Sequence, residues 1–356
     1  MFLPAALLLA AALPIFPQAP AAPPVDDNKQ PVIQTTVKVV IAPTTVTNDH
    51  GDYIPSLLPR DFSLYDNGKL QRVTQDIAFE PLSLVIAIQA SANMEAVLPK
   101  IQKIGALLNA QVLGENGEVA ILCFDHRIQT LTDFTNNTDQ IEAALKKLKP
   151  GSTSSRFNDA AMAGVRMLRH QPPDRRRVLL MIGETRDNSS ELHPRDILTE
   201  SEFDNITIYT LNVSHLIAAF TSTAEPPRPP AVPADAQHLP AGVASTPTTQ
   251  LHNGYANGSV MPAFAEIFRG VKGIFVDNPS ELYTKFTGGR EYSFVTEKSL
   301  ERVLQNLGDD LHSQYLLSYT PDNQSEAGFH DIRVTVNRPN LKVRTRPGYW
   351  VAAKPE

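Results

Sequence analysis

The segment 82–94, LSLVIAIQASANM, sets the fold class of this chain. It opens with Leu82–Ile88, a continuous apolar run that is typical of a strand buried on both faces of a parallel sheet. A polar loop beginning at Gln89 follows at once. Similar apolar runs recur along the chain, separated by segments with apolar residues at helical spacing. The predicted strands are Glu118–Phe124, Ile128–Leu131, Val178–Ile182 and Ile206–Val213, and the predicted helices are Glu95–Leu113, Thr138–Leu148, Asn158–Leu168 and Pro194–Glu202.

This alternation of buried strands and helices predicts an α/β fold with a doubly wound, mostly parallel sheet. The domain is expected over residues 81–312, and its last elements are Ser280–Phe286, Tyr292–Val295 and Leu300–His312. Within it, residues 215–262 are rich in proline and small polar residues. They are predicted to form a disordered insertion without a core of its own.

Strand-rich segments flank this domain on both sides. Residues 32–80 and 313–356 each contain short stretches with the alternation and β-branched residues of strands. Neither flank alone has enough strands for a stable sheet, so they are predicted to pair into one discontinuous, β-sandwich-like module. The alternative is two independent strand clusters packed on the core. The expected strands are Ile33–Ala42, Phe62–Tyr65 and Val73–Phe79 in the first flank, and Tyr315–Tyr319, Asp331–Asn337 and Leu341–Arg346 in the second.

The first residues, 1–22, are predicted to be a secretory signal peptide. Phe2–Phe16 is apolar and uncharged, small residues follow it, and the run is too short to span a bilayer comfortably. An uncleaved membrane anchor or a disordered arm is the alternative. A proline-rich linker is expected at 23–31, and no later segment is apolar for long enough to cross a membrane. We therefore expect an extracytoplasmic protein, periplasmic or secreted, with no membrane span after cleavage.

Composition and motifs narrow the function classes. The net charge of −6 gives no reason to expect a nucleic acid partner. The single cysteine, Cys123, excludes an internal disulfide and a cysteine-based zinc site, and its place in an apolar run predicts a buried residue. The sequence contains no dinucleotide-binding glycine motif, P-loop, H-E-x-x-H or G-x-S-x-G pattern. No catalytic residue is predicted, and an enzyme is the less favoured interpretation.

Three polar loops fall where an open parallel sheet forms its functional crevice: 89–94 (QASANM), 151–155 (GSTSS) and 183–188 (GETRDN). This order of elements and loops resembles the von Willebrand factor A domain, and most closely the A-related proteins with strand-rich flanks described from acidobacteria. The resemblance covers nearly the whole chain after the N-terminal segment. It is carried by the joint order of 61–69 (DFSLYDNGK), 287–290 (TGGR), 313–321 (SQYLLSYTP) and 346–349 (RPGY).

The resemblance implies a Mg²⁺ site, which A domains build from D-x-S-x-S in the first loop, a Thr in the second and an Asp in the third. In this chain Ser91 and Thr153 match, whereas Gln89 and Asn93 replace the first Asp and the last Ser. Ile182 stands where the Asp of the third loop belongs. Both carboxylates are lost, and neutral ligands compensate a dication poorly, so we expect no functional metal and no cofactor.

A polar surface at the mouth of the sheet suits a protein partner even without a metal. The predicted function is therefore non-enzymatic protein interaction outside the cytoplasm, in binding, adhesion or assembly. One alternative is a cation-dependent adhesion-type domain, with a Mg²⁺ site rebuilt by Glu184, Asp187 or Asp159. Others are a structural scaffold and an enzyme that uses this domain only for docking; the partner's identity and the oligomeric state stay open. The predicted partner-binding face comprises Gln89, Ser91, Asn93, Thr153, Glu184 and Asp187.

Overall fold

The computed structural model describes residues 39–76, 81–213, 278–293, 297–322 and 328–351. The predicted signal peptide (1–22), linker (23–31) and proline-rich insertion (215–262) lie outside the described residues, as does most of the first expected strand. Among the described residues, no helix combines the length and the apolar character needed to cross a bilayer.

The α/β domain is built on a six-stranded sheet in the order β10-β9-β8-β5-β6-β7. All neighbouring pairs are parallel except β6 and β7, so β7 is an antiparallel edge strand. This confirms the predicted doubly wound, mostly parallel sheet. The chain order reverses between β5 and β8, which start the two halves of the sheet. The strands are β5 (Leu82–Gln89), β6 (Glu118–Phe124), β7 (Ile128–Thr135), β8 (Arg176–Gly183), β9 (Thr207–Asn212) and β10 (Glu291–Ser293).

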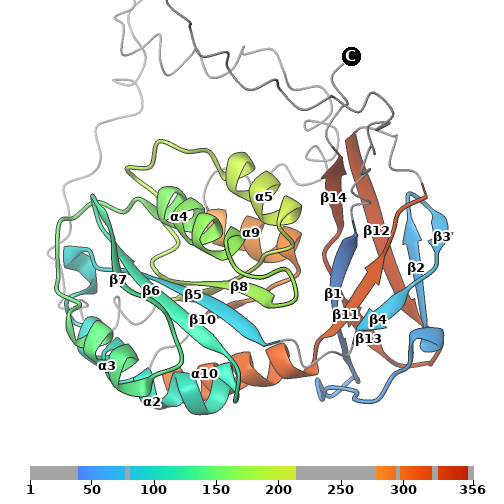
Figure 1. Ribbon diagram of the computed structural model, residues 1–356, viewed down its shortest axis with the longest axis horizontal. Helices are drawn as coiled ribbons and strands as arrows, with labels where there is room; N and C mark the ends of the chain where they lie inside the picture. Colours follow the sequence, from blue (N-terminus) through green and yellow to red (C-terminus); the bar gives the residue numbers. More distant parts are fainter. Residues whose placement is uncertain (1–38, 77–80, 214–277, 294–296, 323–327, 352–356) are drawn as a thin grey trace, which may run out of the picture. The chain divides into compact units, whose positions relative to one another are not determined.

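Helices cover both faces of this sheet (Figure 1). Because side chains alternate along a strand, Leu84 and Ile86 of β5 enter one core while Val85 and Ala87 enter the other. The first core is closed by α1 (Leu98–Ile101), α2 (Gly105–Leu108), α3 (Thr138–Lys146) and α10 (Glu297–Ser313). The second is closed by α4 (Phe157–Arg169), α5 (Pro194–Phe203) and α9 (Pro279–Thr287).

The segment predicted as one helix, Glu95–Leu113, is a succession of short turns, so that prediction was wrong in its continuity. A 3₁₀ turn at Ala92–Met94 precedes α1 and α2, and a π-helical turn at Asn109–Leu113 follows them. Pro99 lies in the first turn of α1, where its missing N–H is tolerated, and it cannot continue a helix from upstream. The helical spacing still marked the side that packs inward, since Val97, Leu98, Ile101, Ile104 and Leu108 are buried.

The β module consists of two four-stranded sheets, β13-β1-β11-β4 and β14-β12-β2-β3. Each sheet contains strands from both flanks of the α/β domain. In the first, β1 pairs antiparallel with β11, and in the second, β2 pairs antiparallel with β12. The predicted pairing of the two flanks is confirmed. The strands are β1 (Val40–Thr47), β2 (Phe62–Asp66), β3 (Lys69–Gln71), β4 (Thr74–Asp76), β11 (Tyr315–Tyr319), β12 (Gly328–Val336), β13 (Lys342–Arg344) and β14 (Gly348–Val351).

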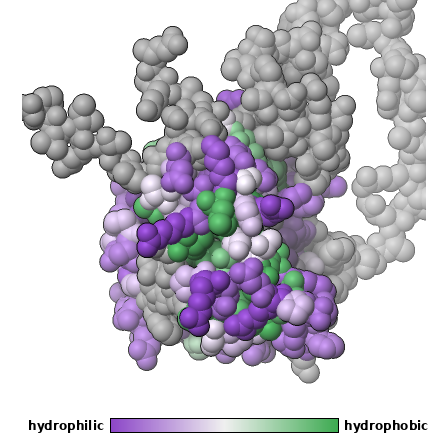
Figure 2. All heavy atoms as spheres, turned by 90° about the vertical axis from the view of Figure 1, so that its right-hand side faces the viewer, coloured by the Kyte–Doolittle hydropathy of each residue, from purple (hydrophilic) through white to green (hydrophobic). Residues whose placement is uncertain are grey.

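The turn after β2, Asp66-Asn67-Gly68, leads into a short strand that the sequence analysis did not predict. Asn67 and Gly68 both have positive φ, 47° and 78°, as the tightest two-residue hairpin requires. The turn joins β2 to the short strand β3, whereas β4, in the expected Val73–Phe79 strand, pairs with β11 in the other sheet. Leu70 in β3 is 62% exposed. Figure 2 looks onto the β-module side of the molecule, where hydrophobic residues reach the surface between hydrophilic ones.

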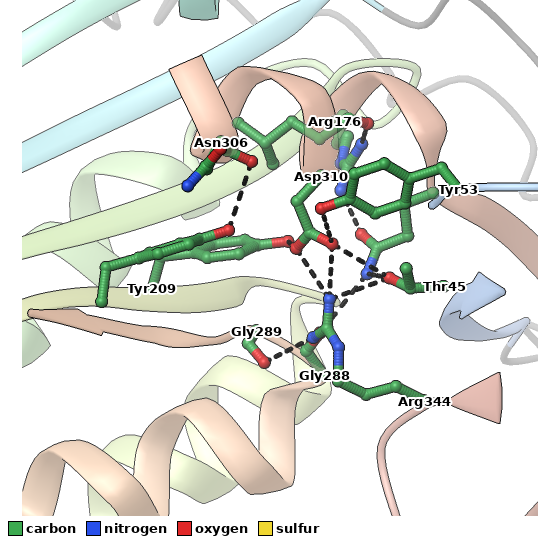
Figure 3. Close-up of polar contacts among 12 residues, drawn as sticks. Thr45, Tyr53, Arg176, Tyr209, Gly288, Gly289, Asn306, Asp310 and Arg344 are labelled. Atoms are coloured by element: carbon green, nitrogen blue, oxygen red, sulfur yellow. Dashed lines mark hydrogen bonds and ion pairs between the residues drawn. The ribbon is translucent and has the colours of Figure 1, made fainter. Parts of the chain in front are cut away.

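A buried carboxylate, Asp310 of α10, links the β module to the α/β domain (Figure 3). From the β module, the Arg344 guanidinium donates to both carboxylate oxygens of Asp310 at 2.7 Å, and the Thr45 hydroxyl donates to one of them at 3.3 Å. From the sheet, the Tyr209 hydroxyl donates to the same carboxylate at 2.9 Å. The carboxylate of Asp310 therefore accepts hydrogen bonds from three strands that are far apart in sequence, β1, β9 and β13.

Candidate functional site

The candidate site lies at the point where the strand order of the sheet reverses. Gln89 is the last residue of β5, and Glu184 directly follows the last residue of the neighbouring strand β8. Ile88 and Ile182 are partners in the parallel register, so the chain leaves both strands at the same level. In open α/β sheets, the crevice beyond the carboxyl ends of the strands at this reversal is where ligands bind.

The side-chain amide of Gln89 connects the two loops, although this residue is only 1% exposed. Its Oε1 accepts a hydrogen bond from the backbone N–H of Glu184 at 2.7 Å. A backbone N–H can only donate, so the oxygen must face Glu184 and the Nε2 group must face the opposite way. Nε2 donates to Ser91 Oγ at 2.8 Å and to the Glu184 carboxylate at 3.2 Å. Both N–H groups of the amide are therefore used inside the site.

Asn93 completes this arrangement from the surface side. Its Nδ2 donates to the same oxygen of Glu184, Oε2, at 3.2 Å. Asn93 is exposed and Glu184 is half-buried, whereas Ser91 is fully buried. Gln89, Ser91, Asn93 and Glu184 thus form one hydrogen-bonded group, which we call the amide–carboxylate cluster.

Gly183 makes the cluster possible. A Cβ atom at this position would lie 2.5 Å from Gln89 Oε1 and 2.7 Å from Gln89 Cβ, closer than real Cβ contacts occur. The close approach of the Gly183 backbone is what lets the amide of Gln89 reach the N–H of Glu184. The glycine is therefore needed for space at this point.

The structure does not bring all the predicted positions into this cluster. Thr153 is exposed on the neighbouring loop, which is tied to the first loop by hydrogen bonds between Ala92 N–H and Ser152 O, 2.8 Å, and between Gly151 N–H and Ala90 O, 2.7 Å. Ile182 lies within the core, with no exposed surface, among the side chains that pack against α10 and α3.

The two other carboxylates considered for a rebuilt site accept hydrogen bonds from groups outside the cluster. Asp187 accepts from the backbone N–H of Asn158 at 2.7 Å, at the start of α4, and from that of Ser190 at 3.0 Å. Asp159 accepts from the side chain of Arg156 at 2.7 Å and from the backbone N–H of Leu192 at 3.0 Å. Of the three carboxylates, Glu184 is the one that joins the amide–carboxylate cluster.

These residues, as they are placed, do not fit Mg²⁺. The ion requires oxygen ligands at near-octahedral positions and is usually held by one or two carboxylates. Here the Gln89 N–H groups point at Ser91 Oγ and at the carboxylate, which are the oxygens that a cation would need. Turning the amide around would place its N–H groups against the backbone N–H of Glu184. Within the described ranges, no group of three or more His, Cys, Asp or Glu side chains is placed to hold a metal ion.

The sequence analysis missed a second polar group at the same edge, formed by Asp125, His126 and Ser152. Asp125 follows β6, and its carboxylate accepts from the backbone N–H groups of Arg127 at 2.8 Å and Ser152 at 3.0 Å. Burial would raise the pKa of Asp125, but these hydrogen bonds, with one from His126, outweigh it and lower the pKa below its ordinary value. The same rule, polar residues at a strand's carboxyl end, could have found it.

This second group is not arranged as a catalytic triad. In a Ser–His–Asp triad, the serine and the aspartate contact opposite nitrogens of the imidazole ring. Here Asp125 Oδ2, at 2.9 Å, and Ser152 Oγ, at 3.1 Å, both contact Nδ1 of His126. In this arrangement the imidazole does not lie between the serine and the aspartate, as it must to take the serine proton in a triad.

No family model matches this chain, and no curated protein matches it. Among solved structures, it is similar to the conserved hypothetical protein BatB from Bacteroides thetaiotaomicron, at 14% identity and a TM-score of 0.41, covering 65% of this chain and 98% of that one. It is also similar to an aerotolerance-related membrane protein from Bacteroides fragilis, at 13% identity and a TM-score of 0.38, covering 64% and 98%. For the SpRpn10 VWA domain, the identity is 14% and the TM-score 0.31, covering 37% and 75%. At these values the likenesses concern the fold and carry no argument about function.

Proposed function

We propose that this chain is a non-enzymatic, extracytoplasmic binding protein that holds a protein partner at the loop edge of its α/β domain without a metal ion. The fold resembles the von Willebrand factor A domain, and the proposed location outside the cytoplasm rests on the apolar segment Phe2–Phe16. The observation that carries the proposal is the amide of Gln89, whose hydrogen bonds to Glu184 and Ser91 take up the groups that would otherwise bind a cation.

The amide–carboxylate cluster also sets the chemistry of the partner. An A domain with its metal offers a cation to a carboxylate of the partner. Here the charged group of the cluster is the half-buried carboxylate of Glu184, held in position by donors from Gln89 and Asn93. Its complement is a positively charged side chain, so the partner contributes a lysine or arginine to this contact.

The loops at this edge are fixed to one another, which favours a binding role over a purely structural one. The first and second loops are joined by backbone hydrogen bonds, and the first and third by the Gln89 amide. Loops fixed in this way lose little conformational entropy when a partner binds. The exposed residues Asn93 and Thr153 then offer further hydrogen-bonding groups beside the carboxylate.

The test is capture of proteins from the envelope fraction by wild-type chain, by Glu184→Arg and by the control Glu115→Arg. Glu115 is exposed and lies in the turn before β6, at the opposite edge of the sheet. We expect the same proteins to be retained by wild type with and without EDTA, lost by Glu184→Arg and retained by Glu115→Arg. If all three proteins capture the same partners equally well, the proposal is wrong. The partner would then bind another face, or the domain would have a purely structural role.

One alternative function has an observation in its favour. Glu184 brings a carboxylate to the cluster, so a cation-dependent A-type domain with a rebuilt site is the second candidate. It requires the Gln89 amide to leave the backbone N–H of Glu184, with which it now makes its shortest hydrogen bond. Loss of capture in EDTA, restored by Mg²⁺, would favour this candidate over the metal-independent one.

A further inference from the structure

A pocket separate from the loop edge lies where the β module meets the segment before β10. Its volume is about 220 Å³, below the range of pockets that enclose drug-sized molecules. Strands β1 and β13, the residues after β1 and the residue before β10 line it together. The side chains that matter for its chemistry are Thr45, Thr47, Tyr53, Arg290, Lys342 and Arg344.

The three cations of this pocket differ in how well they are neutralised. Arg344 is paired with both oxygens of Asp310. Lys342 contacts Asp49 at 3.5 Å, and both side chains are about two-thirds exposed (67% and 65%), so this ion pair is weak. Arg290 has no ion-pair partner among the residues that the structure describes, and its guanidinium lies 5.5 Å from the centre of the Tyr292 ring. The pocket therefore keeps a positive charge.

Neutral residues that carry hydroxyl groups line the pocket together with these cations. Tyr53 donates a long hydrogen bond of 3.4 Å to Asp310 behind the pocket. Burial, together with the charge of Asp310, raises the pKa of Tyr53 to about 12, so the phenol stays protonated and adds no negative charge. Thr47 also lines the pocket, and its side chain carries a further hydroxyl group that can donate.

We propose that this pocket binds the carboxylate group of a small acid or of an acidic side chain, with Arg290 and Lys342 as its charged ligands. The planar guanidinium of an arginine matches the two oxygens of a carboxylate, and the lysine ammonium adds a second donor. A carboxylate fits better than a phosphate because the charges of Arg344 and Lys342 are offset by those of Asp310 and Asp49, which leaves the single positive charge of Arg290 to match one carboxylate. The pocket volume suits one such group on a short stem.

The experiment is calorimetric titration of the full chain, at constant ionic strength, with succinate, with inorganic phosphate and with a capped Gly-Glu-Gly peptide. Arg290→Gln and Lys342→Gln are compared with Arg333→Gln. Arg333 is a matched control, because it is exposed and its guanidinium lies 4.8 Å from the centre of the Tyr65 ring.

We expect succinate or the peptide to bind wild type and Arg333→Gln within about twofold of each other, and Arg290→Gln and Lys342→Gln each to bind about tenfold more weakly. Tighter binding of succinate than of the peptide would assign the pocket to a free acid, and the reverse to an acidic protein segment. The proposal is overturned if wild type binds neither, if phosphate binds more tightly than both, or if Arg333→Gln loses as much affinity as Arg290→Gln.

Discussion

Gln89 and Glu184 are joined twice: the Gln89 Oε1 accepts from the backbone N–H of Glu184 at 2.7 Å, and the Gln89 Nε2 donates to its carboxylate at 3.2 Å. The two residues are 95 positions apart, on loops that follow neighbouring parallel strands. A side chain with one acceptor and two donors satisfies both loops at once. An aspartate in its place would have no donor for the carboxylate of Glu184.

Gln89→Asp should therefore lower stability in the absence of divalent cations and create a response to them. The variant loses the hydrogen bonds of a buried amide and places two carboxylates near each other, which we expect to cost about 1–3 kcal/mol. The thermal midpoint of wild type should not move between EDTA and millimolar Mg²⁺, whereas that of the variant should rise with Mg²⁺ by mass action. A midpoint that rises with Mg²⁺ in wild type would contradict the absence of a working metal site.

Gly183→Ala should destabilise the chain by about 1–3 kcal/mol, because the new Cβ would overlap the buried Gln89 side chain. The control is Gly105→Ala, whose Cβ would meet Glu142 Cγ at 2.8 Å. That side chain is flexible and can move away, so the effect should be smaller. Urea unfolding of both variants measures the difference. Equal effects would show that the space beside Gln89 is not critical.

The sheet of the α/β domain could be predicted because strands buried on both faces leave a local signal. Val178–Ile182 is apolar throughout and Leu82–Ile88 is apolar at every position except Ser83, and both are central strands in the structure. The pairing of the two flanks followed from their having too few strands alone. The boundaries of α1 and α2 could not be predicted from the sequence, because Pro99 and Gly105 divide a segment whose apolar spacing still fits one helix.

The candidate site could be predicted only in part. The loops at Gln89 and Glu184 were found because the carboxyl ends of parallel strands meet at one edge. The direction of the Gln89 amide depends on one backbone N–H that no sequence pattern locates. The buried pair of Asp310 and Arg344 was likewise hidden, since an acidic residue in a helix and a basic one in a distant strand look like ordinary surface residues.

Asp310→Asn should destabilise the junction between the β module and the α/β domain by about 3 kcal/mol, the low end for a broken buried pair. The low end applies because the Arg344 side chain is 34% exposed and keeps some contact with water. Glu142→Gln serves as the control, since it removes an exposed ion pair with Lys146 and should cost less than about 1 kcal/mol. Guanidinium unfolding compares them, and a loss no larger in Asp310→Asn than in the control would show that the junction does not depend on this carboxylate.

Asp125 should make the free energy of unfolding of the chain depend on pH in the acidic range. Despite the opposing effect of burial, hydrogen bonds lower its folded pKa below the ordinary value of 3.8. Such a group stabilises the folded state fully above the pKa of the unfolded chain, and the contribution is lost as the pH falls through the folded pKa. Comparing wild type with Asp125→Asn by urea unfolding at pH 5 and below, we expect the full difference in free energy of unfolding at pH 5. The difference should shrink below about pH 4. A difference that is unchanged or larger at pH 3 would contradict the prediction. It would show that the Ser152 and Arg127 N–H groups do not stabilise the ionised form of the carboxylate.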